Sequence, residues 1–122
     1  LAFRNLNRKV YLSLLSNCEF IIGNSSSGIL EAPSLKKATI NLGVRQKNRV
    51  SAKSVIHIQK VNVKKIDTAI NKIKLKSMKQ ILDKVKNPYG DGKSSERIVK
   101  ILKNIDLNTK LRNKFVDEKD DF

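Results

Sequence analysis

The stretch "EFIIGNSSSGILEAPSLKKATINLGVRQKNR", residues 19–49, contains the pattern that decides the fold. An apolar run ends at Gly23, a serine-rich loop follows, and a second apolar run, "ATINLG", begins at Ala38. Short, continuous apolar runs of this kind are typical of strands that a parallel sheet buries on both faces. Between them we expect a helix over residues 28–36, bent or shortened by Pro33, because proline has no backbone N–H to donate.

The flanking sequence continues the alternation of helix and strand. Further helices are expected at 8–17, after Asn62, at 78–86 and at 94–105, and a third strand at 54–58. Asn62 is a candidate N-cap for the helix that carries Ile66, Ile70 and Ile73 on its inner face. Such alternation favours a parallel sheet with right-handed crossovers. The sequence therefore predicts an α/β fold, a Rossmann-like, three-layer domain over residues 1–105, followed by a polar, frayed tail at 106–122.

The charge of the chain raises the first functional question. The 122 residues have a formal net charge of +15, which is a feature of nucleic-acid binders. However, the lysines are spread over several segments, and two tyrosines, four phenylalanines and no tryptophan offer little for base stacking. A lysine-rich nucleic-acid-binding module therefore stays as an alternative of another class, and nucleic acid is not the partner we expect.

Other classes are limited by what the sequence lacks. Its one cysteine, Cys18, excludes an internal disulfide framework and a multi-cysteine zinc site. No apolar run approaches the ~20 residues of a membrane span, and no secretory pattern is visible. We therefore expect a cytoplasmic protein with no membrane partner, no metal and no cofactor. The chain opens on Leu1 rather than Met, so we also expect a fragment whose N-terminal domain is absent.

The loop "GNSSSG" has two interpretations that stay open. It is either an ordinary turn in which one serine caps the following helix, or an anion site, because ligands of open α/β sheets lie at the carboxyl ends of strands. In the second case Ser25 and Ser26 donate to phosphate, and Gly28 lets the backbone approach an anion closely. Glu31 then accepts both hydroxyls of a ribose, and Arg45, after the second strand, offers a planar donor fork for phosphate or a base carbonyl. The structural alternatives are a helix cap for Glu31 and an exposed loop residue for Arg45.

Three known motifs do not fit this loop. Ile29 and Leu30 stand where a P-loop needs Lys and Ser or Thr. Ser25 replaces the middle glycine of G-x-G-x-x-G, and the hydrolase elbow G-x-S-x-G fails by one residue. The lone histidine, His57, lies within the predicted strand "SVIHI" and is expected to be a strand residue rather than a catalyst.

From about Tyr11 to Leu102 the chain resembles the C-terminal domain of the UDP-N-acetylglucosamine 2-epimerases, enzymes of the two-domain GT-B fold. "IIGNSSSGILEAPSLKKATINLGVRQKNR" is similar to one signature of that family, and "NPYGDGKSSERIVKIL" resembles a second one. The chain has Ser26 and Ser27 in place of a Gly-Gly pair, and Leu30 in place of a second acidic residue. Together with the Arg-Gln pair after the second strand, this resembles the hydrolysing branch.

The resemblance implies the UDP-binding, C-terminal half of a GT-B enzyme that converts UDP-N-acetylglucosamine and water to N-acetylmannosamine and UDP. Close relatives act on UDP-2,4-diacetamido-trideoxyhexoses, and the sequence does not separate these substrates. The resemblance also implies that the acid/base residues belong to the N-terminal domain, so none is catalytic here, and that the full-length protein is a homo-oligomer. Another GT-B sugar-nucleotide enzyme, such as a glycosyltransferase, is the alternative. By matching positions, the UDP contacts fall on Ser25 and Ser26 (diphosphate), Glu31 (ribose) and Arg45 (uridine side), with Asn24, Ser27, Gly28 and Arg49 as weaker candidates.

Overall fold

The structure is a computed structural model that describes residues 2–105, so the predicted tail at 106–122 lies outside the described residues. The chain divides into two compact units, Leu1–Asp91 and Gly92–Phe122. The first unit holds the sheet and its covering helices. The described part of the second unit holds one helix, α5 (Ser94–Asn104), none of whose residues is buried.

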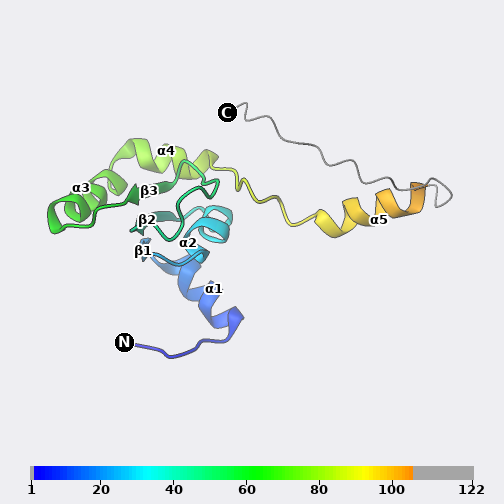
Figure 1. The fold of residues 1–122 in the computed structure, drawn as a ribbon, viewed down its shortest axis with the longest axis horizontal. Helices are drawn as coiled ribbons and strands as arrows, with labels where there is room; N and C mark the ends of the chain where they lie inside the picture. Colours follow the sequence, from blue (N-terminus) through cyan, green and yellow to red (C-terminus); the bar gives the residue numbers. More distant parts are fainter. Residues whose placement is uncertain (1, 106–122) are drawn as a thin grey trace. The chain divides into compact units, whose positions relative to one another are not determined.

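The first unit is built on three parallel strands in the order β1-β2-β3 (Figure 1). Ile22 of β1 pairs with Ile40 of β2, and Ile40 in turn pairs with Ile56 of β3. Helices precede, separate and follow the strands, and their order confirms the predicted α/β alternation. The elements are α1 (Arg8–Asn17), β1 (Phe20–Gly23), α2 (Ser27–Leu30), a 3₁₀ helix η1 (Ala32–Leu35), β2 (Ala38–Leu42), β3 (Val55–Ile58), α3 (Val63–Ile73) and α4 (Lys76–Lys84).

Helices flank the sheet on both faces. Successive side chains of β2 point to opposite faces of the sheet, so each face contacts its own helices. Ala38 and Ile40 face α3 and α4, while Thr39 faces α2 on the other side. Figure 1 shows α3 and α4 on one side of the strands and α1 and α2 on the other. The buried core on the α3 side consists of Ala38, Ile40, Ile58, Ala69, Ile73 and Met78.

The helices after the sheet confirm most of the sequence expectations. Asn62 is the N-cap of α3, and its Oδ1 accepts a hydrogen bond of 2.8 Å from the backbone N–H of Lys65. The predicted inner residues of α3 all pack against the core. The next helix, expected at 78–86, instead begins at Lys76 and ends at Lys84. The apolar pattern located this helix but not its ends, since Met78 is a buried core residue of its first turn and not its start.

The segment after the serine loop is not one helix but two short ones. α2 ends at Leu30, and the 3₁₀ helix η1 begins at Ala32. Pro33 has no N–H for the carbonyl of Ile29, and the N–H of Ser34 bonds to Glu31 rather than to Leu30. The predicted shortening by Pro33 is therefore confirmed, and the continuous helix over residues 28–36 is replaced by a break at Glu31.

The first helix is only partly covered. Of its predicted apolar residues, Leu15 is buried, whereas Val10 and Leu14 are half exposed.

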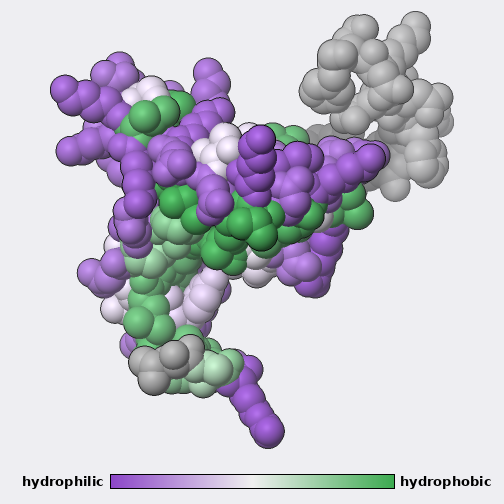
Figure 2. All heavy atoms as spheres, turned by 90° about the vertical axis from the view of Figure 1, so that its left-hand side faces the viewer, coloured by the Kyte–Doolittle hydropathy of each residue, from purple (hydrophilic) through white to green (hydrophobic). Residues whose placement is uncertain are grey.

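Figure 2, which views the first unit from the side of α3, shows hydrophobic groups in a band between hydrophilic ones. None of the helices among residues 2–105 combines the length and apolar character needed to cross a lipid bilayer.

Candidate functional site

The serine loop lies at the carboxyl end of β1, where the chain turns into α2. The hydroxyl oxygen of Ser25 accepts a hydrogen bond of 3.3 Å from the backbone N–H of Ser27, so its own hydrogen stays free to donate. Ser26 is the N-cap residue of α2, but its side chain makes no capping bond. The backbone N–H groups of both serines also donate to no acceptor in the described part of the chain. Two neighbouring residues therefore offer N–H and O–H donors that the fold itself does not use.

The third serine differs from the first two because its hydroxyl is already committed. Ser27 Oγ donates a hydrogen bond of 2.5 Å to Oε2 of Glu31, one helical turn later. The hydroxyl of Tyr11, on α1, lies 2.5 Å from the same Ser27 oxygen. Since a carboxylate only accepts, Ser27 has no hydrogen left, and Tyr11 must be the donor in the second bond. Ser27 therefore orders Glu31 and has no free hydroxyl hydrogen for a ligand.

Glu31 is held through both carboxylate oxygens. Oε1 accepts a hydrogen bond and ion pair of 2.8 Å from Arg8 on α1, while Oε2 accepts the bond from Ser27. The Glu31 side chain is 24% exposed, so it is partly enclosed but still open to solvent. Arg8 is 74% exposed, and ion pairs of such exposed residues contribute little to stability. The carboxylate is thus fixed mainly by Ser27 and remains accessible.

Gly28 is buried against β2 rather than placed at the open face of the loop. A Cβ atom at this position would lie 2.6 Å from Cγ2 of Thr39. The carbonyl of Gly28 accepts a hydrogen bond of 2.8 Å from the Thr39 hydroxyl, and its N–H donates to Ser25. The missing side chain therefore allows close packing of helix on strand. Since α2 has only four residues, its helix dipole contributes little to the binding of an anion.

The second candidate loop, which follows β2, is tied to the serine loop. Arg45 and Arg49 are both exposed, and their guanidinium groups make no hydrogen bond or ion pair among the described residues. Between them, Gln46 is 3% exposed, and its Nε2 donates a hydrogen bond of 2.9 Å to the carbonyl of Asn24. This bond fixes the orientation of the Gln46 amide and joins the two loops. The structure thus brings the two loops together, with Arg45 next to the residue that connects them.

Three residues of this arrangement had no predicted role. Arg8 and Tyr11 lie on α1 and reach Glu31 and Ser27 only through the fold. Gln46 had a signal, since its pairing with Arg45 was one of the features that resembled the hydrolysing branch. A buried glutamine between two exposed arginines indicates a loop with a specific tertiary partner.

The histidine is a strand residue, as predicted. His57 lies in β3, and its ring contacts Nδ2 of Asn41 at 3.1 Å and the hydroxyl of Ser51 at 2.9 Å. Since the Asn41 amide donates to Nδ1, the Nε2 atom carries the ring hydrogen and donates to Ser51. His57 and Arg49 border a polar pocket of about 320 Å³, which none of the three serines lines.

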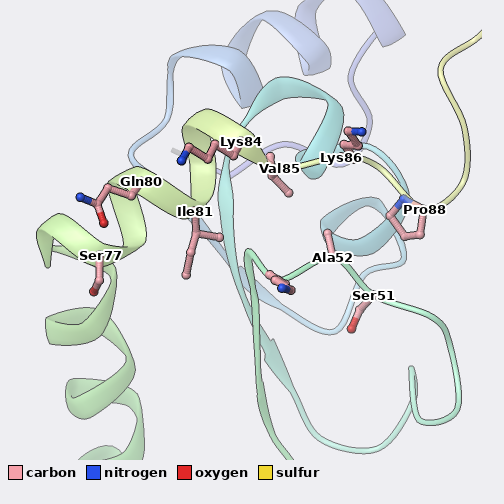
Figure 3. A pocket seen from close by; sticks show the side chains of 10 residues that line it. Ser51, Ala52, Ser77, Gln80, Ile81, Lys84, Val85, Lys86 and Pro88 are labelled. Atoms are coloured by element: carbon pink, nitrogen blue, oxygen red, sulfur yellow. The ribbon is translucent and has the colours of Figure 1, made fainter.

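A larger pocket of about 690 Å³ lies elsewhere on the first unit, between α4 and the segment before β3 (Figure 3). It is bordered by Ser51, Ala52, Lys53, Ser77, Gln80, Ile81, Lys84, Val85, Lys86 and Pro88. None of the predicted site residues belongs to it. Among residues 2–105 no group of three or more His, Cys, Asp or Glu side chains is arranged to hold a metal ion. The candidate site therefore offers hydroxyl, amide and guanidinium donors and one carboxylate acceptor.

Comparison with known proteins places the chain in a family. Residues 1–103 match the family model described as UDP-N-acetylglucosamine 2-epimerase, so the chain belongs to that family. It is 38% identical over 115 residues to the UDP-N,N'-diacetylbacillosamine 2-epimerase (hydrolyzing) of Legionella pneumophila. It is also 42% identical over 116 residues to the GDP/UDP-N,N'-diacetylbacillosamine 2-epimerase (hydrolyzing) of Campylobacter jejuni. These matches cover 91% and 94% of the chain.

A third relative, the polysialic acid biosynthesis protein P7 of Escherichia coli, is 40% identical over 93 residues, or 76% of the chain. All three matches cover only part of the relatives, namely 28%, 29% and 24% of their lengths. The chain thus spans between a quarter and a third of the length of two relatives and about a quarter of the third. The family resemblance seen in the two sequence motifs is confirmed.

Proposed function

We propose that this chain is the UDP-binding part of a hydrolysing UDP-N-acetylglucosamine 2-epimerase with a GT-B architecture. The observation that carries the proposal is the pair of serines at the carboxyl end of β1, whose hydroxyl and backbone hydrogens have no partner in the described fold. Four unpaired donors on adjacent residues suit the oxygens of a diphosphate. The hydrolysing relatives support the same choice within the family.

The remaining candidates surround this donor pair. Glu31, with its two oxygens already oriented, accepts the ribose hydroxyls. Arg45 has a free guanidinium on the loop that Gln46 ties to Asn24, and it binds the uridine side or the diphosphate. Arg49 and Asn24 shape the same edge. Positive charge at this edge also favours an anionic ligand over a neutral sugar.

The role of these residues is to hold the leaving group. In the proposed reaction the C2–H bond and the C1–O bond to UDP break, which releases UDP and forms a 2-acetamidoglucal. Water then adds across the double bond, with the hydroxyl at C1 and the hydrogen at the opposite face of C2, to give N-acetylmannosamine. Protein donors that bind the oxygens of the diphosphate stabilise the negative charge that develops as the C1–O bond breaks. The proton transfers belong to residues outside this chain.

The reaction is tested with the protein at its native length. Incubation with UDP-N-acetylglucosamine is expected to release UDP and free N-acetylmannosamine, which mass spectrometry and chromatography against standards identify. A parallel incubation with a UDP-2,4-diacetamido-trideoxyhexose decides which sugar is preferred. Formation of a glycosidic bond to an added acceptor, without free sugar, would instead support the glycosyltransferase alternative.

The site is tested separately by titration of UDP into isotope-labelled protein. Amide shifts are expected at Ser25, Ser26 and Glu31, with saturation at one equivalent. Shifts confined to lysine-rich α3, or binding of any nucleic acid with a steep dependence on salt, would contradict the assignment.

A further inference from the structure

We propose that Ser27 and Tyr11 are positioning residues that make the proposed nucleotide site selective for a ribose with both hydroxyls. The inference rests on the proposed function, since it concerns how Glu31 recognises the sugar of UDP. It depends on the hydrogen bonds that reach the carboxylate from two other elements of the fold.

The first step is the direction of the hydrogen bonds. Tyr11 donates to Ser27, and Ser27 donates to Oε2 of Glu31, because the carboxylate has no hydrogen to give. Each hydroxyl in this series has one hydrogen and one available direction. The series therefore has only one arrangement, in which Tyr11 on α1 fixes the Ser27 hydroxyl and Ser27 fixes the carboxylate.

The second step is the number of acceptor positions that remain. An ionised carboxylate has about two acceptor positions on each oxygen. Ser27 uses one position on Oε2, and Arg8 uses one on Oε1. One position is left on each oxygen, and the Glu31 side chain is still 24% exposed. Two adjacent acceptors on one rigid group match the two neighbouring O–H donors of a ribose.

Arg8 and Ser27 differ in how firmly they hold the Glu31 carboxylate. Arg8 is 74% exposed, so its contact with Glu31 is open to water and salt. Ser27 is partly buried and is itself held by Tyr11. Without Ser27 the carboxylate can rotate, and it then binds a sugar with one hydroxyl about as well as a sugar with two. We therefore expect loss of Ser27 or of the Tyr11 hydroxyl to weaken discrimination between ribose and 2′-deoxyribose, in addition to any effect on affinity.

The experiment measures the affinities of UDP and 2′-deoxy-UDP by calorimetry on the protein at its native length. The wild type is expected to prefer UDP by about tenfold or more, which corresponds to one hydrogen bond to a charged group. Ser27→Ala is expected to reduce this preference to within about threefold, and Tyr11→Phe to an intermediate value. Ser27→Thr, which keeps the hydroxyl, is expected to restore it. The matched controls are Ser13→Ala, on the exposed surface of α1, and Tyr89→Phe, whose hydroxyl bonds to the carbonyl of Val50.

The outcomes separate this inference from the function on which it rests. If the wild type binds neither nucleotide, the proposed function fails and the inference falls with it. If the wild type prefers UDP and Ser27→Ala keeps the full preference, the site stands and the positioning role is wrong. If Ser27→Ala does not fold, as judged by its thermal transition, Tyr11→Phe decides the question. Its preference must then fall below that of Tyr89→Phe, and an unchanged preference overturns the inference.

Discussion

Asn87 Nδ2 donates a hydrogen bond of 2.7 Å to the backbone carbonyl of Leu30, although the two residues are 57 positions apart. Leu30 is the last residue of α2, and the break at Glu31 leaves its carbonyl without the helical partner it would otherwise have, since the N–H of Ser34 bonds to Glu31. The same Asn87 amide also donates to the Ser34 hydroxyl at 2.7 Å, and its Oδ1 accepts from the backbone of Tyr89. Asn87, the first residue of the "NPYGDG" motif, thus closes the helix end next to Glu31.

The first prediction follows from this contact. Asn87→Ala leaves the Leu30 carbonyl without its donor, so we expect the free energy of unfolding to fall by about 1–3 kcal/mol. Urea denaturation measures the change. Asn71→Ala, on the exposed surface of α3, is the control and is expected to change stability by less than about 0.5 kcal/mol. Equal effects at the two positions would show that the Asn87 contact is not stabilising.

The second prediction concerns the close packing of Gly28 on β2. Gly28→Ala places a Cβ atom 2.6 Å from Thr39 Cγ2, and such overpacking costs about 1–3 kcal/mol. Thr39→Ser removes that methyl group but keeps the hydroxyl that bonds to the Gly28 carbonyl. We therefore expect the double variant Gly28→Ala/Thr39→Ser to be more stable than the sum of the single changes predicts. Strict additivity in thermal or urea unfolding would contradict the contact.

The third prediction tests the proposed diphosphate donors. Ser26→Ala removes a hydroxyl that makes no hydrogen bond in the described fold, so stability is expected to change little. Ser25→Ala also removes the acceptor of the Ser27 N–H and is expected to lower the free energy of unfolding by about 1 kcal/mol. Affinity for UDP is expected to fall about tenfold or more for each, the size of a hydrogen bond to a charged group. Calorimetry measures this loss, with Ser13→Ala as the control. Unchanged affinity in both variants would remove these serines from the site.

The fourth prediction tests the tie between the two loops. Gln46→Leu places an apolar side chain of similar size in this buried position and removes the donor to the Asn24 carbonyl, so the free energy of unfolding is expected to fall by about 1 kcal/mol or more. Amide hydrogen exchange around Asn24 should become faster, and UDP affinity should fall because Arg45 is no longer held near the serine loop. Gln80→Leu, on the exposed side of α4, is the matched control. Exchange rates that do not differ between the two variants would argue against the tie.

The elements of the sheet were predictable because their signals are local. Continuous apolar runs ending at glycine gave β1 and β2, and the i, i+4, i+7 spacing of three isoleucines gave α3. The effect of Pro33 was also local, since a missing N–H acts only on the same helix. The exact ends of α4 were less predictable, and both lie two residues before the expected ones, because an apolar pattern locates a helix but does not specify where it begins and ends.

The candidate site was predictable only in part. The serines, Glu31 and Arg45 stand out in the sequence because they follow buried strands and belong to a family motif. Arg8, which pairs with Glu31 across 23 positions, has no such signal, since an arginine at the start of a helix looks the same in the sequence whether or not it has a distant partner. Asn87 had a signal as part of a motif, but its partner at Leu30 did not.

By itself the sequence determined the α/β class, the alternation of helices with strands of a parallel sheet, and membership of the 2-epimerase family. Repeated local patterns and two long motifs carry that information. Only the tertiary structure decided what each polar residue of the loop is able to do. A hydroxyl has one hydrogen, and whether it is free depends on which acceptor the fold places beside it. Glu31 accepts a hydrogen bond from the Ser27 hydroxyl, whereas no acceptor in the described chain receives one from the hydroxyls of Ser25 and Ser26.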